Sequence, residues 1–200
     1  MILNKPLLIC MLILLLAINF SFSQDKKSAN KTQNQAHFDY NNFPIKKGKL
    51  GEIKIGMTIS EAEKKFDRLR KENNTAGNFG YDGGGVAFVY FEKEKPVFAF
   101  IPKFENDTIL AIIAMSEKLK TSNGLHPNSS VKEILKIYPD IQVNLDMLNG
   151  KEYIFEAKNQ LTFYFSTDPE NSIGDYDFEK YQFSSAPKRL NFKADWITIK

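Results

Sequence analysis

The two histidines have the widest chemical range of any residues in this chain, since imidazole can act as a general base or bind zinc. His37 lies in a polar N-terminal stretch, and His126 stands beside Pro127 in an expected turn. Nucleophilic catalysis needs a base next to the nucleophile, and a zinc site needs several ligands at regular spacing. Neither pattern surrounds these histidines. The sequence therefore indicates no catalytic residue, no metal site and no cofactor.

A glycine-rich stretch, Gly80–Gly85, invites comparison with phosphate-binding loops. It lacks the Lys-Ser/Thr ending of a P-loop, and it precedes an expected strand, whereas the dinucleotide-binding motif precedes a helix. We interpret it as a flexible turn that enters a strand.

Carboxylates are densest near the C-terminus, where their oxygens are of the kind that calcium prefers. They are Asp168, Glu170, Asp175, Asp177 and Glu179. Their spacing fits no EF-hand, and Lys180 follows directly, so a solvated charged loop is the favoured interpretation and calcium binding stays open. No pair of acids stands out as a glycosidase dyad, which leaves a hydrolase the least favoured function.

The N-terminus resembles an export signal. Lys5 precedes an uninterrupted apolar run, Leu7–Ile18, which is too short to span a membrane comfortably. Ser21 and Ser23 supply small residues at the −3 and −1 positions, which predicts cleavage after Ser23. Cys10 lies inside the apolar run without a small residue before it, so a lipoprotein anchor is disfavoured. We expect an exported chain, periplasmic or secreted, without a membrane span after cleavage.

Composition limits the classes of protein that remain. The chain has 200 residues, of which 42% are hydrophobic and 26% charged, with a formal net charge of +3. These values exclude a disordered polymer and a multi-span membrane protein, and the balanced charge gives no support to nucleic-acid binding. A single cysteine excludes an internal disulfide framework. The length suits one substantial domain.

The chain divides into three predicted parts: the signal peptide (1–23), a flexible polar leader (24–48) and a single domain (49–200). Aromatic residues between His37 and Phe43 suggest that the end of the leader docks on the domain. Within the domain we predict two similar halves, about 50–120 and 123–200, each a short helix followed by an antiparallel meander.

Each predicted helix begins with the same signal. Thr58 and Glu61 have the spacing of a capping box, and so do Ser130 and Glu133. Strands are expected after each helix, where β-branched and aromatic runs alternate with turns. The expected strands are 86–91, 97–102, 108–115, 142–147, 151–157, 161–166 and 196–200. The predicted fold class is α+β, one curved antiparallel sheet with the helices on one face.

Aromatic residues recur at two-residue spacing within the strands, so each pair faces one side of the sheet. The set expected to form the core is Phe88, Tyr90, Phe98, Phe100, Tyr153, Phe155, Phe163 and Phe165. Val89, Phe91 and Tyr164 alternate with this set and are expected on the opposite, open face. With Tyr81 from the glycine-rich turn, they are the candidate partner-binding residues.

The segment Ile55-Gly56-Met57-Thr58, followed by Glu61-Ala62 and Phe66, resembles the opening of the SmpA/OmlA-type outer-membrane assembly lipoproteins. Two such helix-plus-sheet units in tandem resemble the β-lactamase-inhibitor-protein-like fold. The resemblance implies an exported, non-catalytic protein that binds through its sheet. Unlike these families, the expected mature chain has no disulfides and no acylated cysteine, since Gln24 stands where the lipoproteins carry one.

The sequence thus predicts a non-enzymatic binding or scaffold protein of the bacterial envelope, which contacts a protein or peptide through the open sheet face. The alternative is a binder of a small molecule or glycan on the same face.

Overall fold

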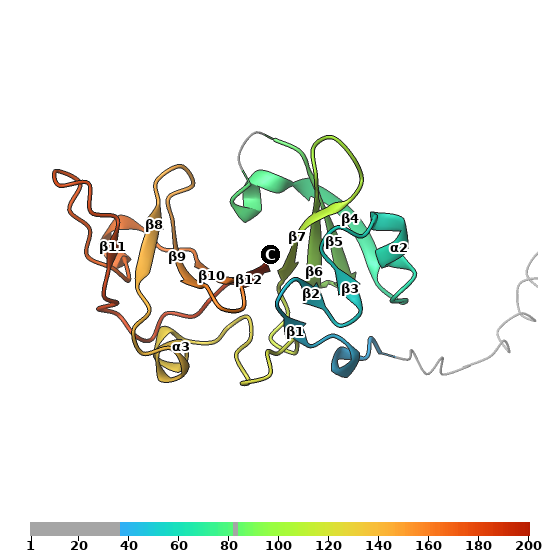
Figure 1. The fold of residues 1–200 in the computed structure, drawn as a ribbon, viewed down its shortest axis with the longest axis horizontal. Coiled ribbons are helices and arrows are strands. Elements are labelled where there is room, and N and C mark those ends of the chain that lie inside the picture. Colours follow the sequence, from blue (N-terminus) through green and yellow to red (C-terminus); the bar gives the residue numbers. More distant parts are fainter. Residues whose placement is uncertain (1–36, 82–83) are drawn as a thin grey trace, which may run out of the picture. The chain divides into compact units, whose positions relative to one another are not determined.

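The structure, a computed structural model, describes residues 37–81 and 84–200 (Figure 1). The expected signal peptide and leader residues 24–36 lie outside the described residues. His37–Lys200 forms one unit, so the fold begins twelve residues before the expected boundary at residue 49. The reason is apolar burial: Phe38 and Phe43 lie in the core. No helix in the described part of the chain is long and apolar enough to cross a membrane.

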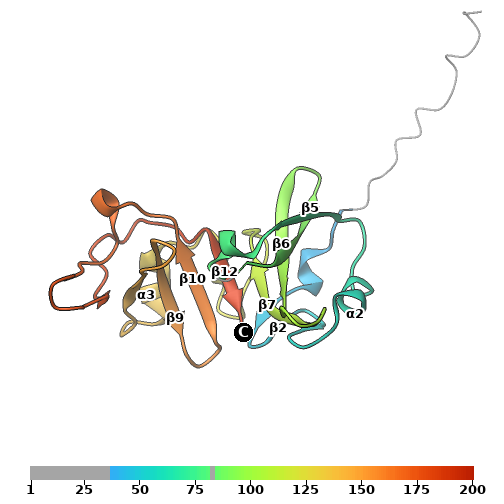
Figure 2. The same ribbon diagram turned by 90° about the horizontal axis from the view of Figure 1, so that it is seen from above.

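The fold is a sheet-rich α+β arrangement in which every strand pair within the sheets is antiparallel (Figure 2). One large sheet has nine strands. In spatial order these are β11 (Ser184–Ser185), β8 (Val143–Asp146), β9 (Lys151–Glu156), β10 (Leu161–Phe165), β12 (Trp196–Ile199), β7 (Ile109–Ala114), β6 (Lys95–Pro102), β5 (Val86–Glu92) and β4 (Arg70–Thr75). The last strand in the chain, β12, therefore lies in the interior of the sheet, between β10 and β7.

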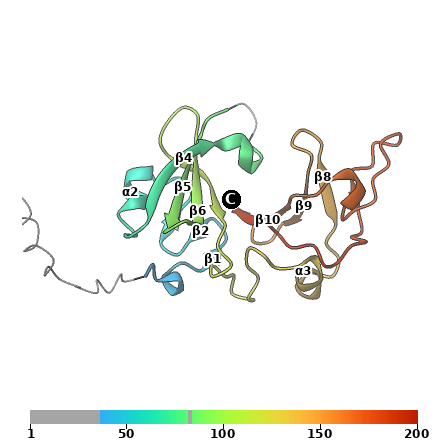
Figure 3. The same ribbon diagram turned by 180° about the vertical axis from the view of Figure 1, so that it is seen from behind.

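Two short helices begin as their sequences predict. In α2 (Ile59–Glu63) the Thr58 hydroxyl accepts the backbone N–H of Glu61, whose carboxylate accepts the N–H of Thr58. Ser130 and Glu133 make the same reciprocal bonds at the start of α3 (Val131–Ile137). Both capping boxes are thereby confirmed. Each helix buries an apolar face against the same side of the sheet, the first face; α2 and α3 are labelled in Figure 3.

The first face carries most of the core. Tyr90, Phe98, Phe100, Phe163 and Phe165 are almost fully buried there, which confirms these five as core residues. A small sheet of β1 (Ile45–Lys46), β2 (Lys49–Leu50) and β3 (Ile53–Lys54) covers part of the same face. Burial of Ile45, Leu50 and Ile53 fixes this small sheet, which the sequence pattern did not predict as strands.

The residues before β1 form an arm held by a carboxylate. Glu92 accepts hydrogen bonds from the backbone N–H of Phe38 at 3.1 Å and from the Tyr40 hydroxyl at 2.9 Å. Tyr40 begins a 3₁₀ turn, η1 (Tyr40–Asn42). Burial acts to raise the pKa of Glu92, but the bonds from Tyr40 and Phe38 hold it below its ordinary value. Burial and the bond to Glu92 raise the pKa of Tyr40 to about 12. The expected docking of the leader's end is confirmed by this geometry.

Strand β4 was not predicted, because Arg70–Thr75 contains no apolar residue and is exposed throughout. It forms one edge of the sheet by pairing with β5. The Arg70 guanidinium lies 4.8 Å from the Phe91 ring centroid, and the Lys71 ammonium 4.0 Å from that of Phe88. These cations cover aromatic surface on both faces of β5, which suits a solvent-exposed edge.

Candidate functional site

The second face of the large sheet, turned away from α2 and α3, carries a row of aromatic rings. Tyr153 and Tyr164 are directly paired across β9 and β10, with ring centroids 5.7 Å apart. Tyr164 stacks on Trp196 of β12 at 5.2 Å, and Trp196 meets Phe79 edge-on at 5.9 Å. The row therefore crosses three strands and reaches the segment that precedes β5.

That segment covers part of the second face, which the sequence prediction took to be open. The 3₁₀ turn η2 (Ala76–Phe79) packs Ala76 and Phe79 over the small side chains Ala87, Ala99 and Ala111. Val89 lies in this cluster and is only 2% exposed. Its expected role as a partner-binding residue is corrected here, because the turn removes its side chain from the surface.

The other three candidates pack at the margin of this cluster. Tyr81, Phe91 and Tyr164 are half-buried and therefore retain exposed area. Tyr81 and Tyr164 approach one another, and burial followed by the neighbouring Tyr164 raises the pKa of Tyr81. Phe91 lies apart from them, on β5 beneath Arg70. The structure thus brings together two of the four predicted residues.

Two aromatic residues predicted for the core belong instead to the second face. Tyr153 is paired with Tyr164, and Phe155 is 45% exposed. Ile154 takes the core position between them, with Glu152 and Glu156 buried on either side. The sequence Tyr153-Ile154-Phe155 is apolar throughout, so its pattern does not reveal which residues point inward. Ile154 is directly paired with the core residue Phe163, and directly paired residues share a face. Ile154 therefore points inward, and Tyr153 and Phe155 point to the second face.

Polar atoms are buried among these rings without partners. The Trp196 indole N–H, the Thr198 hydroxyl and the Tyr81 hydroxyl have no hydrogen-bond partner among the described residues. Two ammonium groups lie close by: Lys151 is 5.6 Å from the Trp196 ring centroid and Lys200 is 5.3 Å from that of Tyr81. The second face therefore presents aromatic surface and two nearby cations, and the three unpaired polar atoms lie buried beneath it.

A separate cavity of about 420 Å³ lies beside β8 and β9. Glu152 forms part of its wall and is fully buried, yet has no ion-pair partner among the described residues. Its carboxylate accepts bonds from the Thr167 and Tyr176 hydroxyls, both at 2.6 Å, and from the backbone N–H groups of Ile173 and Gly174, both at 2.7 Å. Burial and the hydrogen bond to Glu152 raise the pKa of Tyr176. Glu152 thereby fixes the long connection from β10 to β12.

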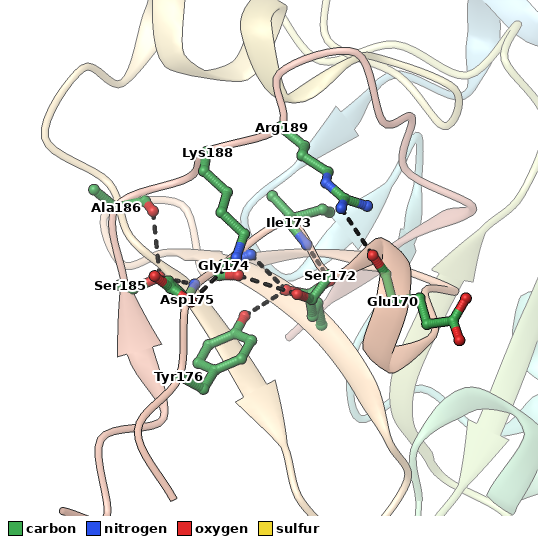
Figure 4. A network of polar contacts seen from close by, with 11 residues as sticks. Glu170, Ser172, Ile173, Gly174, Asp175, Tyr176, Ser185, Ala186, Lys188 and Arg189 are labelled. Atoms are coloured by element: carbon green, nitrogen blue, oxygen red, sulfur yellow. Dashed lines mark hydrogen bonds and ion pairs between the residues drawn. The ribbon is translucent and has the colours of Figure 1, made fainter.

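Three acidic residues of that connection make local bonds, and the contact between Asp175 and Lys188 is among those drawn in Figure 4. Asp168 accepts the N–H groups of Glu170 and Asn171, and begins η3 (Pro169–Asn171). Asp175 pairs with Lys188 at 3.1 Å, and Asp177 with Lys180 at 2.8 Å. No three metal-ligating side chains gather within residues 37–81 and 84–200. The carboxylates of Asp168, Asp175 and Asp177 thus bond to groups within the same connection.

The two histidines lie in different segments and make unrelated contacts. His37 lies 3.2 Å from Glu92 in the N-terminal arm. The ring of His126 contacts the carbonyl oxygen of Pro127 at 2.6 Å, and its backbone N–H bonds to the Ser129 hydroxyl. His37 thus contacts a residue of β5, and His126 contacts its own turn.

Comparison with known proteins adds information on the fold. No protein-family model matches this chain, and no curated protein matches it. The chain is similar to a solved structure described as the uncharacterized protein yfeY from Escherichia coli, with a TM-score of 0.50 and 13% sequence identity. The match covers 78% of this chain and 99% of that one. At this identity the likeness concerns the fold alone.

Proposed function

We propose that this protein is an exported, non-enzymatic binding or scaffold protein of the bacterial envelope, and that it holds a protein or peptide on the second face of its sheet. The observation that carries the proposal is the aromatic surface of Tyr153, Phe155 and Tyr164 on two adjacent strands. Phe155 is 45% exposed, so much of its ring is available to a partner. Aromatic side chains at such a position supply large contact area at low entropic cost.

The proposal includes a duplication. The order α2-β4-β5-β6-β7 matches the order α3-β8-β9-β10-β12 once the two-residue edge strand β11, which lies between β10 and β12 in the chain, is set aside. The final strands of the two series pair with each other inside the sheet. Both series open with the same capping box. These features support the resemblance to tandem SmpA/OmlA-type units and to the β-lactamase-inhibitor-protein-like fold. They favour a non-catalytic role, because the families that the chain resembles bind proteins through their sheets and are not enzymes.

The second candidate is a binder of a small molecule or glycan on the same face. The aromatic row on this face favours it, because sugar rings and other small ligands bind against aromatic side chains. Tyr164 stacks beside Trp196, so a sugar ring placed there would also contact aromatic surface.

Affinity capture with matched variants tests the proposal. The full-length chain, Phe155→Ser and Ile137→Ser are each incubated with envelope extract, and the retained polypeptides are identified by mass spectrometry. Ile137 is a suitable control because it lies on α3, away from the second face, and has a similar exposed fraction of 38%. We expect a polypeptide that the original chain and Ile137→Ser retain and Phe155→Ser loses.

Equal retention by all three proteins would overturn the proposal. Retention of no polypeptide, together with saturable binding on a glycan array that Phe155→Ser reduces, would support the second candidate instead. Thermal unfolding of each variant is measured first, so that loss of binding is separated from loss of folding.

A further inference from the structure

Lysine residues form a row across the small sheet. Lys46 is directly paired with Lys49 across β1 and β2, and Lys49 is directly paired with Lys54 across β2 and β3. Paired residues on adjacent strands point to the same face, and like charges at such positions destabilise a sheet. Lys47 lies in the turn between β1 and β2. Four positive charges therefore lie within or beside three two-residue strands.

These lysines are set apart by their pairing, because no other two cations are directly paired across strands of the described sheets. Lys46, Lys47, Lys49 and Lys54 have no ion pair among the described residues, even though the chain is nearly neutral as a whole. Directly paired lysines without an ion pair favour a counter-charge that comes from another molecule.

A cleft of about 380 Å³ opens beside this row. Its lining includes Lys46, Lys47 and Lys49 but no carboxylate side chain. Glu156 is near in the sequence to the lining residue Asn159. However, its buried carboxylate accepts the N–H groups of Lys158 and Asn159 and the Asn159 side-chain amide.

Other residues that line the cleft supply neutral donors. The Asn123 side-chain amide donates to the Tyr138 hydroxyl at 3.1 Å, which leaves the Tyr138 proton available to a ligand. Ser122 adds an exposed hydroxyl. Ile45, whose backbone N–H bonds to the carbonyl oxygen of Lys120 at 2.8 Å, joins the segment that contains Ser122 to β1. The donors therefore come from two segments that are tied together.

We infer that this cleft is an anion site, which binds the phosphoryl group of a small phosphorylated molecule or of a lipid headgroup. Lysine ammonium groups bind phosphate as point charges, and hydroxyl groups bond to the remaining oxygens. The cleft is larger than a phosphoryl group, so it also accommodates the attached part of the ligand beside the Tyr138 ring. This inference does not depend on the proposed function, because the cleft and the second face share none of the residues named for either.

Titration of the full-length, ¹⁵N-labelled chain with inorganic phosphate and with glycerol 3-phosphate tests the inference. We expect saturable shifts of the Gly48, Ser122 and Asn123 amides, since these border the cleft. Vesicles of phosphatidylcholine with and without phosphatidic acid distinguish the two sources of the phosphoryl group. Sedimentation with phosphatidic acid vesicles alone assigns a lipid headgroup, and binding of glycerol 3-phosphate without sedimentation assigns a free ligand. Either result supports the anion site.

Two triple variants separate the site from general charge. Lys46→Gln/Lys47→Gln/Lys49→Gln removes the row. Its control, Lys103→Gln/Lys132→Gln/Lys136→Gln, removes the same charge from other exposed positions. We expect the first to bind at least about tenfold more weakly and the second to bind almost normally. Because it relieves repulsion, the first variant also unfolds at a higher temperature without ligand, whereas phosphate stabilises only the original chain and the control.

Tyr138→Phe is expected to weaken binding about tenfold while keeping every charge, because it removes one hydroxyl donor to a charged group. Absence of saturable binding to any of the probes would overturn the inference. Equal weakening in both triple variants would do the same, since it would indicate screening by net charge alone.

Discussion

Glu152 offers a direct test of how the long connection between β10 and β12 is held. We consider the change Glu152→Gln, which keeps the shape of the side chain and removes its charge. Each carboxylate oxygen accepts one hydroxyl and one backbone N–H: Thr167 with Ile173 on one, and Tyr176 with Gly174 on the other. Glutamine has a single oxygen, so it can retain only one of these pairs.

The expected loss of stability comes from the hydroxyl and the backbone N–H that the glutamine oxygen no longer accepts. A hydroxyl can rotate and accept a bond from the new amide N–H₂, but a backbone N–H cannot. One buried N–H is therefore left without an acceptor, at a cost of about 1–3 kcal/mol, and the retained bonds lose their charge assistance. The lower desolvation cost of a neutral amide offsets part of this. We expect the free energy of unfolding to fall by about 2–3 kcal/mol.

Urea unfolding followed by the fluorescence of Trp196, the single tryptophan of the chain, measures this loss. Hydrogen exchange at the Ile173 and Gly174 amides should accelerate as well. Glu179→Gln is the matched control, because this exposed residue of the same connection accepts none of these bonds. A loss below about 1 kcal/mol, or a gain in stability, would show that burial of the charge costs as much as the four bonds contribute.

Three further predictions concern the arm and the helix starts. Phe38→Ala should lower the free energy of unfolding by about 3 kcal/mol, measured by urea unfolding, because a buried ring stacked on Phe43 is lost. An unchanged value would mean that the arm is not docked in solution. Ser130→Ala should cost about 1 kcal/mol by the same measurement, through loss of the cap of α3, and a change within error would contradict the capping box. Tyr40 should titrate near pH 12 by ultraviolet absorbance. Since its folded pKa is raised above its ordinary value of 10.0, its contribution to stability is present below pH 10 and lost as the pH rises towards 12. A midpoint near 10 would exclude the bond to Glu92.

Local signals in the sequence predicted much of the fold. The capping boxes at Thr58 and Ser130 depend on residues three positions apart, and both form as expected. Strands β5, β6 and β10 alternate clearly enough to indicate both their positions and the residues that face the helices. Strand β4 has no such pattern, because Arg70–Thr75 joins the sheet through backbone pairing alone.

The candidate site depended on contacts that no local pattern contains. Val89 is buried because η2 folds back over it, and the polar residues near η2 give no indication of this. The orientation of Tyr153 is fixed by the inward position of Glu152, whose partners lie more than ten residues further along the chain. A charged residue at a core position contradicts the usual pattern, so only the structure reveals the aromatic row.

The interior position of β12 has a consequence for how the protein is made. A chain that leaves the ribosome or a translocation channel N-terminus first presents β7 and β10 long before the strand that joins them. Each of these strands keeps one edge with unpaired backbone groups until β12 is made. The sheet can therefore close only when synthesis reaches Trp196. Until then, these two strands are targets for chaperones. A frameshift between Phe165 and Trp196 would leave two unjoined half-sheets that are prone to aggregate.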